Sequence, residues 1–132
     1  LATIGDIRNG LQVRLATITG LHANDIWPEP LLTPAAVPMP EGDMDLTFDG
    51  GHITTFAIVV VVDRSSLRVA QDTLDGYMSD SGADSIQAAI EGGPTLAGAV
   101  DTIIWHGWSD YGLMTIDETP YFGAKATLEV IH

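Results

Sequence analysis

The chain contains no cysteine among its 132 residues. This absence excludes disulfide cross-links, thiolate metal ligands and a cysteine nucleophile. It fits a reducing compartment, or a particle that is assembled in one. The length and a hydrophobic content of 45% suit a single domain, residues 1–132, with one packed core.

Basic residues are also scarce. The chain has five Lys and Arg against 18 Asp and Glu, which gives a formal net charge of −13. No Lys or Arg occurs between Leu15 and Asp63, or between Val69 and Ala124. Nucleic-acid binding depends on basic residues that neutralise phosphates, so we expect no sequence-specific nucleic-acid binding.

No apolar run is long enough to cross a membrane. The run Phe56–Val62 has seven residues, whereas a spanning helix needs about 20. The N-terminus also lacks a basic segment followed by an apolar run, so we expect no signal peptide. The sequence therefore predicts no membrane partner.

Motifs for catalysis, cofactor binding and metal binding are missing. None of the four histidines has the spacing of a metal-ligand motif. Residues 93–98 have the glycine spacing of a Walker loop, but Ala99 and Val100 replace its Lys and Ser or Thr. We therefore assign no catalytic, cofactor-binding or metal residue.

Two alternatives stay open. Asp101 or Asp110 could meet His106 in space and form an acid/base pair. Asp43 and the acids after it invite a calcium-loop interpretation, but Phe48 stands where such a loop needs Gly. An acidic hairpin tip is the preferred interpretation of that region.

What the chain does have is one very apolar stretch, His52–Asp63 with the sequence HITTFAIVVVVD. Its alternate residues form two apolar faces, with Phe56, Ile58, Val60 and Val62 on one and Ala57, Val59 and Val61 on the other. A strand of this kind should be covered on both faces. We therefore predict a central β-strand.

Apolar residues at helical spacing predict an N-terminal helix over about residues 4–18. Thr3 is its expected N-cap, and Gly20 follows its end. The same reasoning predicts a second helix over about residues 67–78 and a shorter third one around residues 86–90.

Residues 27–51 combine a Pro-rich arm with an acidic hairpin tip. Residues 28–40 include five prolines, and proline cannot donate to a sheet ladder, so we expect an extended arm or edge strand. The Asp-Gly-Gly turn at residues 49–51 predicts a β-hairpin over residues 44–62.

The rest of the chain is predicted to form three strands, over residues 100–105, 113–116 and about 121–131. Trp105 and Trp108 lie where the first of these strands is expected to run into a loop. Two roles are open for each tryptophan, core packing and anchoring at a protein interface.

Together these elements predict an α+β fold. We expect a mainly antiparallel β-sheet with a long β-hairpin, an N-terminal helix, and one or two further helices packed on one face.

Five segments of the C-terminal part resemble the small tail terminator, or tail completion, proteins of long-tailed bacteriophages, especially those of actinobacterial hosts. The segments are SSLRVAQDTLDGYMS, GADSIQAAIEG, TLAGAVDTIIW, DYG and YFGAKATLEVI. The similarity covers about residues 64–131. Residues 1–20 agree only in being an amphipathic helix, and the Pro-rich arm agrees least.

The resemblance implies a virion structural protein of the tail or neck, assembled in the host cytoplasm, and not an enzyme. Its implied form is a ring, expected to be a homohexamer, that caps the tail tube and stops its polymerisation. The implied partners are further copies of the chain, the tail tube protein and the head–neck connector protein, with DNA passing through the lumen. Another neck or tube subunit, such as a head–tail joining protein, or a small α+β enzyme or ligand-binding module, remains an alternative.

A neighbouring subunit would cover the second apolar face of the central strand, or an edge near it. The predicted interface residues are Trp27, Leu31, Val37, Met39, Val59, Val61 and Trp108. An acidic lumen would keep DNA from sticking, because like charges repel. The predicted lumen-facing acids are Glu41, Asp43, Asp45 and Asp49.

Overall fold

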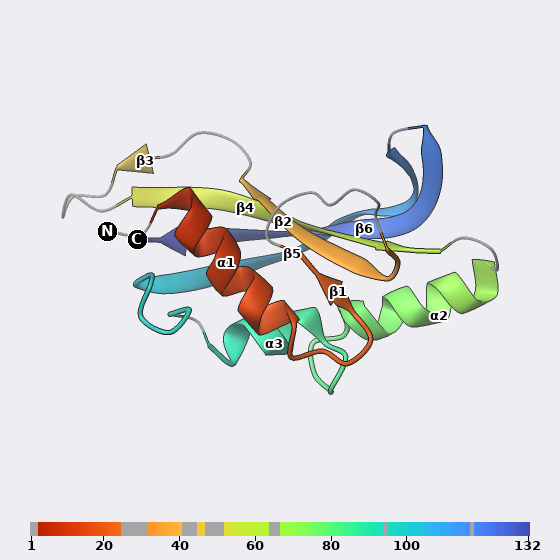
Figure 1. Cartoon of the computed structure of the whole chain (residues 1–132), viewed down its shortest axis with the longest axis horizontal. Coiled ribbons are helices and arrows are strands. Elements are labelled where there is room, and N and C mark those ends of the chain that lie inside the picture. The colour runs from red at the N-terminus through yellow and green to blue at the C-terminus, as the bar shows by residue number, and fades with distance from the viewer. Residues whose placement is uncertain are drawn as a thin grey trace.

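The computed structural model describes residues 3–24, 32–40, 45–46, 52–63, 67–93, 95–116 and 118–132. In chain order its elements are α1 (Ile4–Leu15), β1 (His22–Ala23), β2 (Ala35–Pro40), β3 (Asp45–Leu46), β4 (His52–Val62), α2 (Leu67–Met78), α3 (Ile86–Glu91), β5 (Thr102–Ile116) and β6 (Thr119–Ile131). They form one mixed sheet with the three helices against it (Figure 1). The predicted α+β class is confirmed.

The sheet is organised around β4. Its strand order is β1-β2-β4-β6-β5, and the short β3 pairs with the first residues of β4. All neighbours are antiparallel except β1 and β2, which are parallel. The strand predicted to be central therefore has β2 on one side and β6 on the other.

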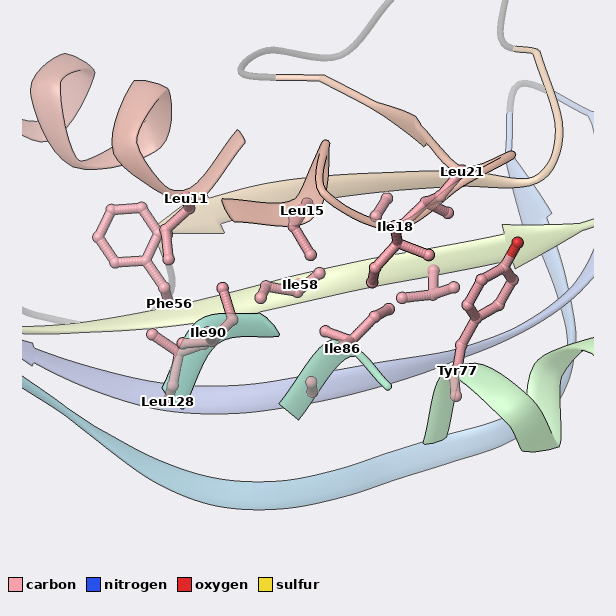
Figure 2. Close-up of a cluster of buried hydrophobic side chains, with 14 of the residues drawn as sticks. Leu11, Leu15, Ile18, Leu21, Phe56, Ile58, Tyr77, Ile86, Ile90 and Leu128 are labelled. Atoms are coloured by element: carbon pink, nitrogen blue, oxygen red, sulfur yellow. The ribbon is translucent and has the colours of Figure 1, made fainter. Parts of the chain in front are cut away.

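The helices cover one face of this sheet. On β4 that face carries Phe56 and Ile58, which lie opposite Leu128 and Ala126 of β6. The helices contribute side chains of the same kind, and Figure 2 shows Leu11, Leu15, Ile18, Tyr77, Ile86 and Ile90 gathered over the strands. Burying one large aliphatic side chain stabilises the fold by about 1.5–3 kcal/mol, so this layer is the main source of stability.

The start of α1 agrees with the sequence. Thr3 is the N-cap, and its Oγ1 accepts a hydrogen bond from the Asp6 N–H at 3.1 Å. The Thr3 N–H donates in return to Asp6 Oδ2 at 3.0 Å, and the bonds from Thr3 lower the pKa of the Asp6 carboxyl. This reciprocal pair satisfies two N–H groups at the helix start.

The end of α1 differs from the prediction, because the helix stops at Leu15 and not near residue 18. In the turn that follows, the N–H groups of Thr17 and Ile18 donate to the carbonyls three residues earlier. This tighter winding still directs Ile18 into the core, where it is buried. The apolar spacing therefore predicted which side of this segment is buried, but not the residue at which the helix ends.

Arg14 joins α1 to α3. Its Nε donates to the Ala89 carbonyl oxygen at 2.8 Å, near the C-terminal end of α3. A cation is favourable there, because the helix dipole is negative at that end. Gly92 and Gly93 make room for the guanidinium, since a Cβ on either would lie within 3 Å of Arg14 atoms.

The Pro-rich segment forms strand β2, and its prolines interrupt no bond to β4. The His22 and Asn24 N–H groups donate to the carbonyls of Pro34 and Ala36, so the even-numbered residues here direct their backbone groups towards β1. Pro38 and the proline two residues later are also even-numbered. Their missing N–H groups therefore face away from β4, as expected for a strand at or near a sheet edge.

The predicted hairpin over residues 44–62 is described in part. Among its described residues, Asp45 and Leu46 pair with β4 in antiparallel orientation, opposite Ile53 and His52. The long hairpin of the fold is the pair β5–β6, with strands of 15 and 13 residues.

The loop predicted between residues 105 and 113 is not present, and the prediction is corrected. These residues belong to one continuous strand, β5, which accommodates extra residues at two register shifts. One shift lies between Trp105 and Gly107 and the other between Ser109 and Gly112, where Asp110 has a φ of 57°. Bulges of this kind let a strand keep its pairing while it bends.

Two glycines of α1 provide a test of the packing. Gly5 is exposed, and a Cβ there would meet only Thr3 Oγ1 at 3.7 Å. Gly5→Ala should raise the free energy of unfolding by about 0.5–1 kcal/mol, because alanine favours a helix. At Gly10 a Cβ would lie 2.9 Å from the Cβ of Leu96. Gly10→Ala should therefore lower the free energy of unfolding by about 1 kcal/mol, since the cost of overpacking against Leu96 exceeds the gain in helix propensity.

Urea denaturation of both variants measures these changes. The packing of Leu96 against α1 would be contradicted if the two substitutions stabilised the protein equally.

Candidate interaction surfaces

The second face of β4 points away from the helices. Three cross-strand pairs join β2 to β4 on this face, Ala35–Val61, Val37–Val59 and Met39–Ala57. Four of these six side chains are at most 2% exposed, although they are not part of the core under the helices. The second face thus has a small buried apolar group of its own.

The predicted interface residues on this face fall into two groups. Val37 and Val61 are 1% and 0% exposed within the single chain, so they have no surface to offer a partner in this conformation. Val59 is half-buried, and Met39 is 43% exposed. On this face, Met39 and Val59 are therefore the predicted interface residues that keep accessible surface.

Trp108 lies on the face that the helices cover. It packs against the core, and its ring meets that of Trp105 edge to face, with 5.9 Å between the ring centroids. Its Nε1 is buried and makes no hydrogen bond to the described residues. Trp108 thus packs against the core while it stays partly exposed, and its role as an interface anchor stays a prediction.

Several predicted residues lie outside the described part of the chain, namely Trp27, Leu31, Glu41, Asp43 and Asp49. Asp45 is described only as a backbone position in β3, opposite Ile53. The proposed acidic lumen and the calcium alternative therefore stay predictions.

Charged side chains occupy the β6–β5 side of the second face. His106 Nε2 lies 3.3 Å from Glu129 Oε1, and Lys125 Nζ lies 3.8 Å from Asp110 Oδ2. The acid that lies beside His106 is therefore Glu129, and not Asp101 or Asp110, the two acids that the open alternative considered. Partly exposed pairs of this kind contribute at most about 1 kcal/mol each.

A hydroxyl–imidazole pair that the sequence did not reveal connects β4 to the end of the described chain. Thr54 Oγ1 and His132 Nε2 are 2.8 Å apart. A hydroxyl beside an imidazole can act as a nucleophile and its base. Here both residues are buried, at 4% and 6% exposure, so a substrate cannot reach the hydroxyl. The pair is structural, and only the β4–β6 register, which sets Thr54 opposite Val130, could have predicted it.

A second contact missed by sequence reasoning ties the long hairpin to α2. The Tyr111 hydroxyl donates to Asp75 Oδ1 at 3.1 Å, and the Tyr111 ring meets Phe122 edge to face at 5.2 Å. Burial raises the pKa of Tyr111, and the hydrogen bond to Asp75 and its charge raise it further. The contact therefore joins β5 to α2.

Other kinds of site find no support in the described ranges. There, no three His, Asp or Glu side chains are grouped so that they could hold a metal ion. None of the described helices has both the length and the apolar character needed to span a bilayer.

No model of a known protein family matches the chain, and a comparison with curated proteins finds no match either. The resemblance of residues 64–131 to tail terminators therefore depends on the five quoted segments alone.

Thr54→Val tests the buried pair. The substitution keeps the side-chain shape but removes the buried hydrogen bond to His132 Nε2, so the free energy of unfolding should fall by about 1–3 kcal/mol. Thr55 is half-buried on the other face of β4, and Thr55→Val should change stability by no more than about 0.5 kcal/mol. Thermal unfolding followed by circular dichroism measures both, and equal effects would contradict the role of the pair.

Proposed function

We propose that this protein is a virion structural protein, a subunit of a ring-forming tail terminator of a long-tailed bacteriophage. The ring, a homohexamer, caps the tail tube, stops its polymerisation and joins it to the head–neck connector protein. DNA passes through its lumen. The observation that carries the proposal is the set of five segments between residues 64 and 131 that resemble this family.

The positions of these segments in the fold support the proposal. They coincide with α2, α3, the approach to β5 and its first residues, the second bulge in β5 and most of β6. Ser85 illustrates their role, because its Oγ caps α3 by accepting a hydrogen bond from the Ala88 N–H at 3.0 Å. The shared residues therefore supply caps, bulges and core contacts, as expected of a resemblance between assembly proteins without a common active site.

Surface properties give a second line of support. Met39 and Val59 leave apolar surface on the second face, which a neighbouring subunit could cover. The net charge of −13 suits a channel through which DNA must slide without binding. Within the proposal Glu41, Asp43, Asp45 and Asp49 face the lumen, and a ring structure with these acids pointing outward would contradict that placement.

The direct test is to add the purified protein to tail tubes that lack a terminator and to image them by electron microscopy. We expect a cap at one end of each tube, because a terminator must present two unlike faces. Assembly of the protein into long tubes would instead identify a tube subunit, and binding to the connector alone would identify a head–tail joining protein. A protein that binds neither structure would contradict the proposal and favour an enzyme or ligand-binding module.

Three valine substitutions test the subunit contact. Val59→Asp should leave a folded chain that no longer assembles, because it places a charge on half-buried apolar surface. Val61→Asp should instead lower the free energy of unfolding by about 4 kcal/mol or more, since it buries an unpaired charge. Val69 is 63% exposed on α2, so Val69→Asp is the control that should change neither property.

Circular dichroism reports folding, and the fraction of capped tubes reports assembly. A Val59→Asp protein that caps tubes as well as the wild type would exclude Val59 from the interface.

A further inference from the structure

The two edges of the sheet differ in what they offer to a further strand. At one edge, β1 pairs with the first two residues of β2, and further along β2 the missing N–H groups of Pro38 and Pro40 face away from β4. Prolines at an edge prevent a further strand from pairing there. The opposite edge is β5, which contains no proline, lysine or arginine (Figure 1). β5 therefore lacks the residue types that usually block an open edge.

The register shows which residues of β5 direct their backbone groups outwards. In an antiparallel ladder, residues that face one neighbouring strand alternate with residues that face the other. When this alternation is followed from β2 through β4 and β6, Thr102 and Ile104 face β6, whereas Ile103 and Trp105 face outwards. Trp108, beyond the first register shift, also faces outwards. Among the described residues, no backbone hydrogen bond outside the sheet ladder involves these outward groups.

The outward residues are large and apolar, and none of them is fully buried. Ile103, Trp105 and Trp108 are half-buried at the border of the core under the helices, and their two indole rings meet edge to face. A strand added at this edge would place its own side chains beside the two tryptophans, a residue type that contributes strongly to protein interfaces. The edge thus combines open backbone groups with an apolar wall.

A register shift limits the length of the segment that this edge can hold. The shift between Trp105 and Gly107 interrupts the regular ladder, so the first continuous part of the edge is residues 102–105. Bulges increase the local twist of a strand and shorten the stretch that a straight partner strand can follow. The edge therefore suits a short extended segment and not a long strand.

Charge indicates the chemistry of that segment. Asp101 immediately precedes β5 and is exposed, as is Asp110 further along the strand. Lysines or arginines of a partner segment would lie beside these acids, and complementary charge of this kind favours one partner over others. Two copies of a chain with a net charge of −13 repel each other, which disfavours pairing between two β5 edges.

We propose that the outer edge of β5, centred on Ile103 and Trp105, binds a short extended segment of another protein. The segment adds a strand to the sheet through the outward N–H and C=O groups. Its apolar side chains pack on Trp105 and Trp108, and its lysines or arginines lie beside Asp101. The surface is separate from the apolar atoms of the second face, and the proposal does not depend on the suggested role in a phage tail.

Amide hydrogen exchange of the full chain, followed by nuclear magnetic resonance, tests the pairing. The probe is a short peptide of alternating threonine and valine with two lysines at each end. In the free protein the amides of Thr102 and Ile104 should be protected, and those of Ile103 and Trp105 should exchange rapidly. A millimolar excess of the peptide should slow exchange at Ile103 and Trp105 by about tenfold or more, because each N–H gains a hydrogen bond.

Two results of this experiment would overturn the proposal. One is exchange at Ile103 and Trp105 that the peptide does not change. The other is protection of these amides in the free protein that rises with protein concentration together with a doubled mass, since the occupant would then be a second copy of the chain.

Methylation of the peptide nitrogens distinguishes strand addition from attraction between charges alone. In an antiparallel arrangement the valines face the tryptophans and direct their N–H groups towards β5. Methylation of the valine nitrogens should therefore abolish binding, whereas methylation of the threonine nitrogens should leave it in place. Equal binding of the two methylated peptides would contradict strand addition.

Asp101→Asn tests the charge preference. It should weaken binding of the lysine peptide by about twofold to fivefold, the effect of losing one exposed charge pair. Asp72 is exposed on α2, which follows the other end of β4, so Asp72→Asn is the control that should leave the affinity unchanged. Isothermal titration calorimetry measures both variants. A peptide with glutamates in place of the lysines should bind more weakly, and equal affinities for the two peptides would contradict a basic partner.

Discussion

Strand β4 imposes the constraint on which the rest of the fold depends. Its backbone must pair on both edges, and its side chains are apolar on both faces. Pairing with β2 and β6 satisfies the two edges. The helices cover one face, where Phe56 and Ile58 pack beneath α1 and α3 (Figure 2). The second face has no such helical layer among the described elements, and the chain solves this problem with small and partly polar side chains.

That solution divides the second face into three parts. Ala35, Val61 and Gly123 form a row across β2, β4 and β6 in which all three residues are buried. Towards β3, Met39 and Val59 keep apolar atoms accessible. Towards β5, pairs such as His106–Glu129 make the surface polar. Burial of small residues therefore lets a single chain remain folded while part of an apolar face stays available for contact.

The spacing of apolar residues predicted those elements whose hydrophobic pattern can be recognised within a single segment of the chain. β4, the three helices and the Thr3 cap could all be predicted in this way. β5 could not, because Gly107 and Asp110 are typical of loops, whereas pairing with β6 holds them in a bulged strand. The contacts Thr54–His132 and Tyr111–Asp75 join residues 78 and 36 positions apart, so they follow only from the strand register and the packing of α2. The sequence also predicted the two faces of β4 correctly, but not that Val61 would be buried within the chain.

Within the proposed function, the second face of β4 is the surface that matters most. Met39 and Val59 keep apolar atoms accessible there, although Val61 is fully buried. A neighbouring subunit that covered these atoms would complete the burial of a strand that is apolar on both faces. The small size of the accessible area also suits a subunit that has to remain folded before it assembles, because a large exposed apolar surface promotes unwanted association.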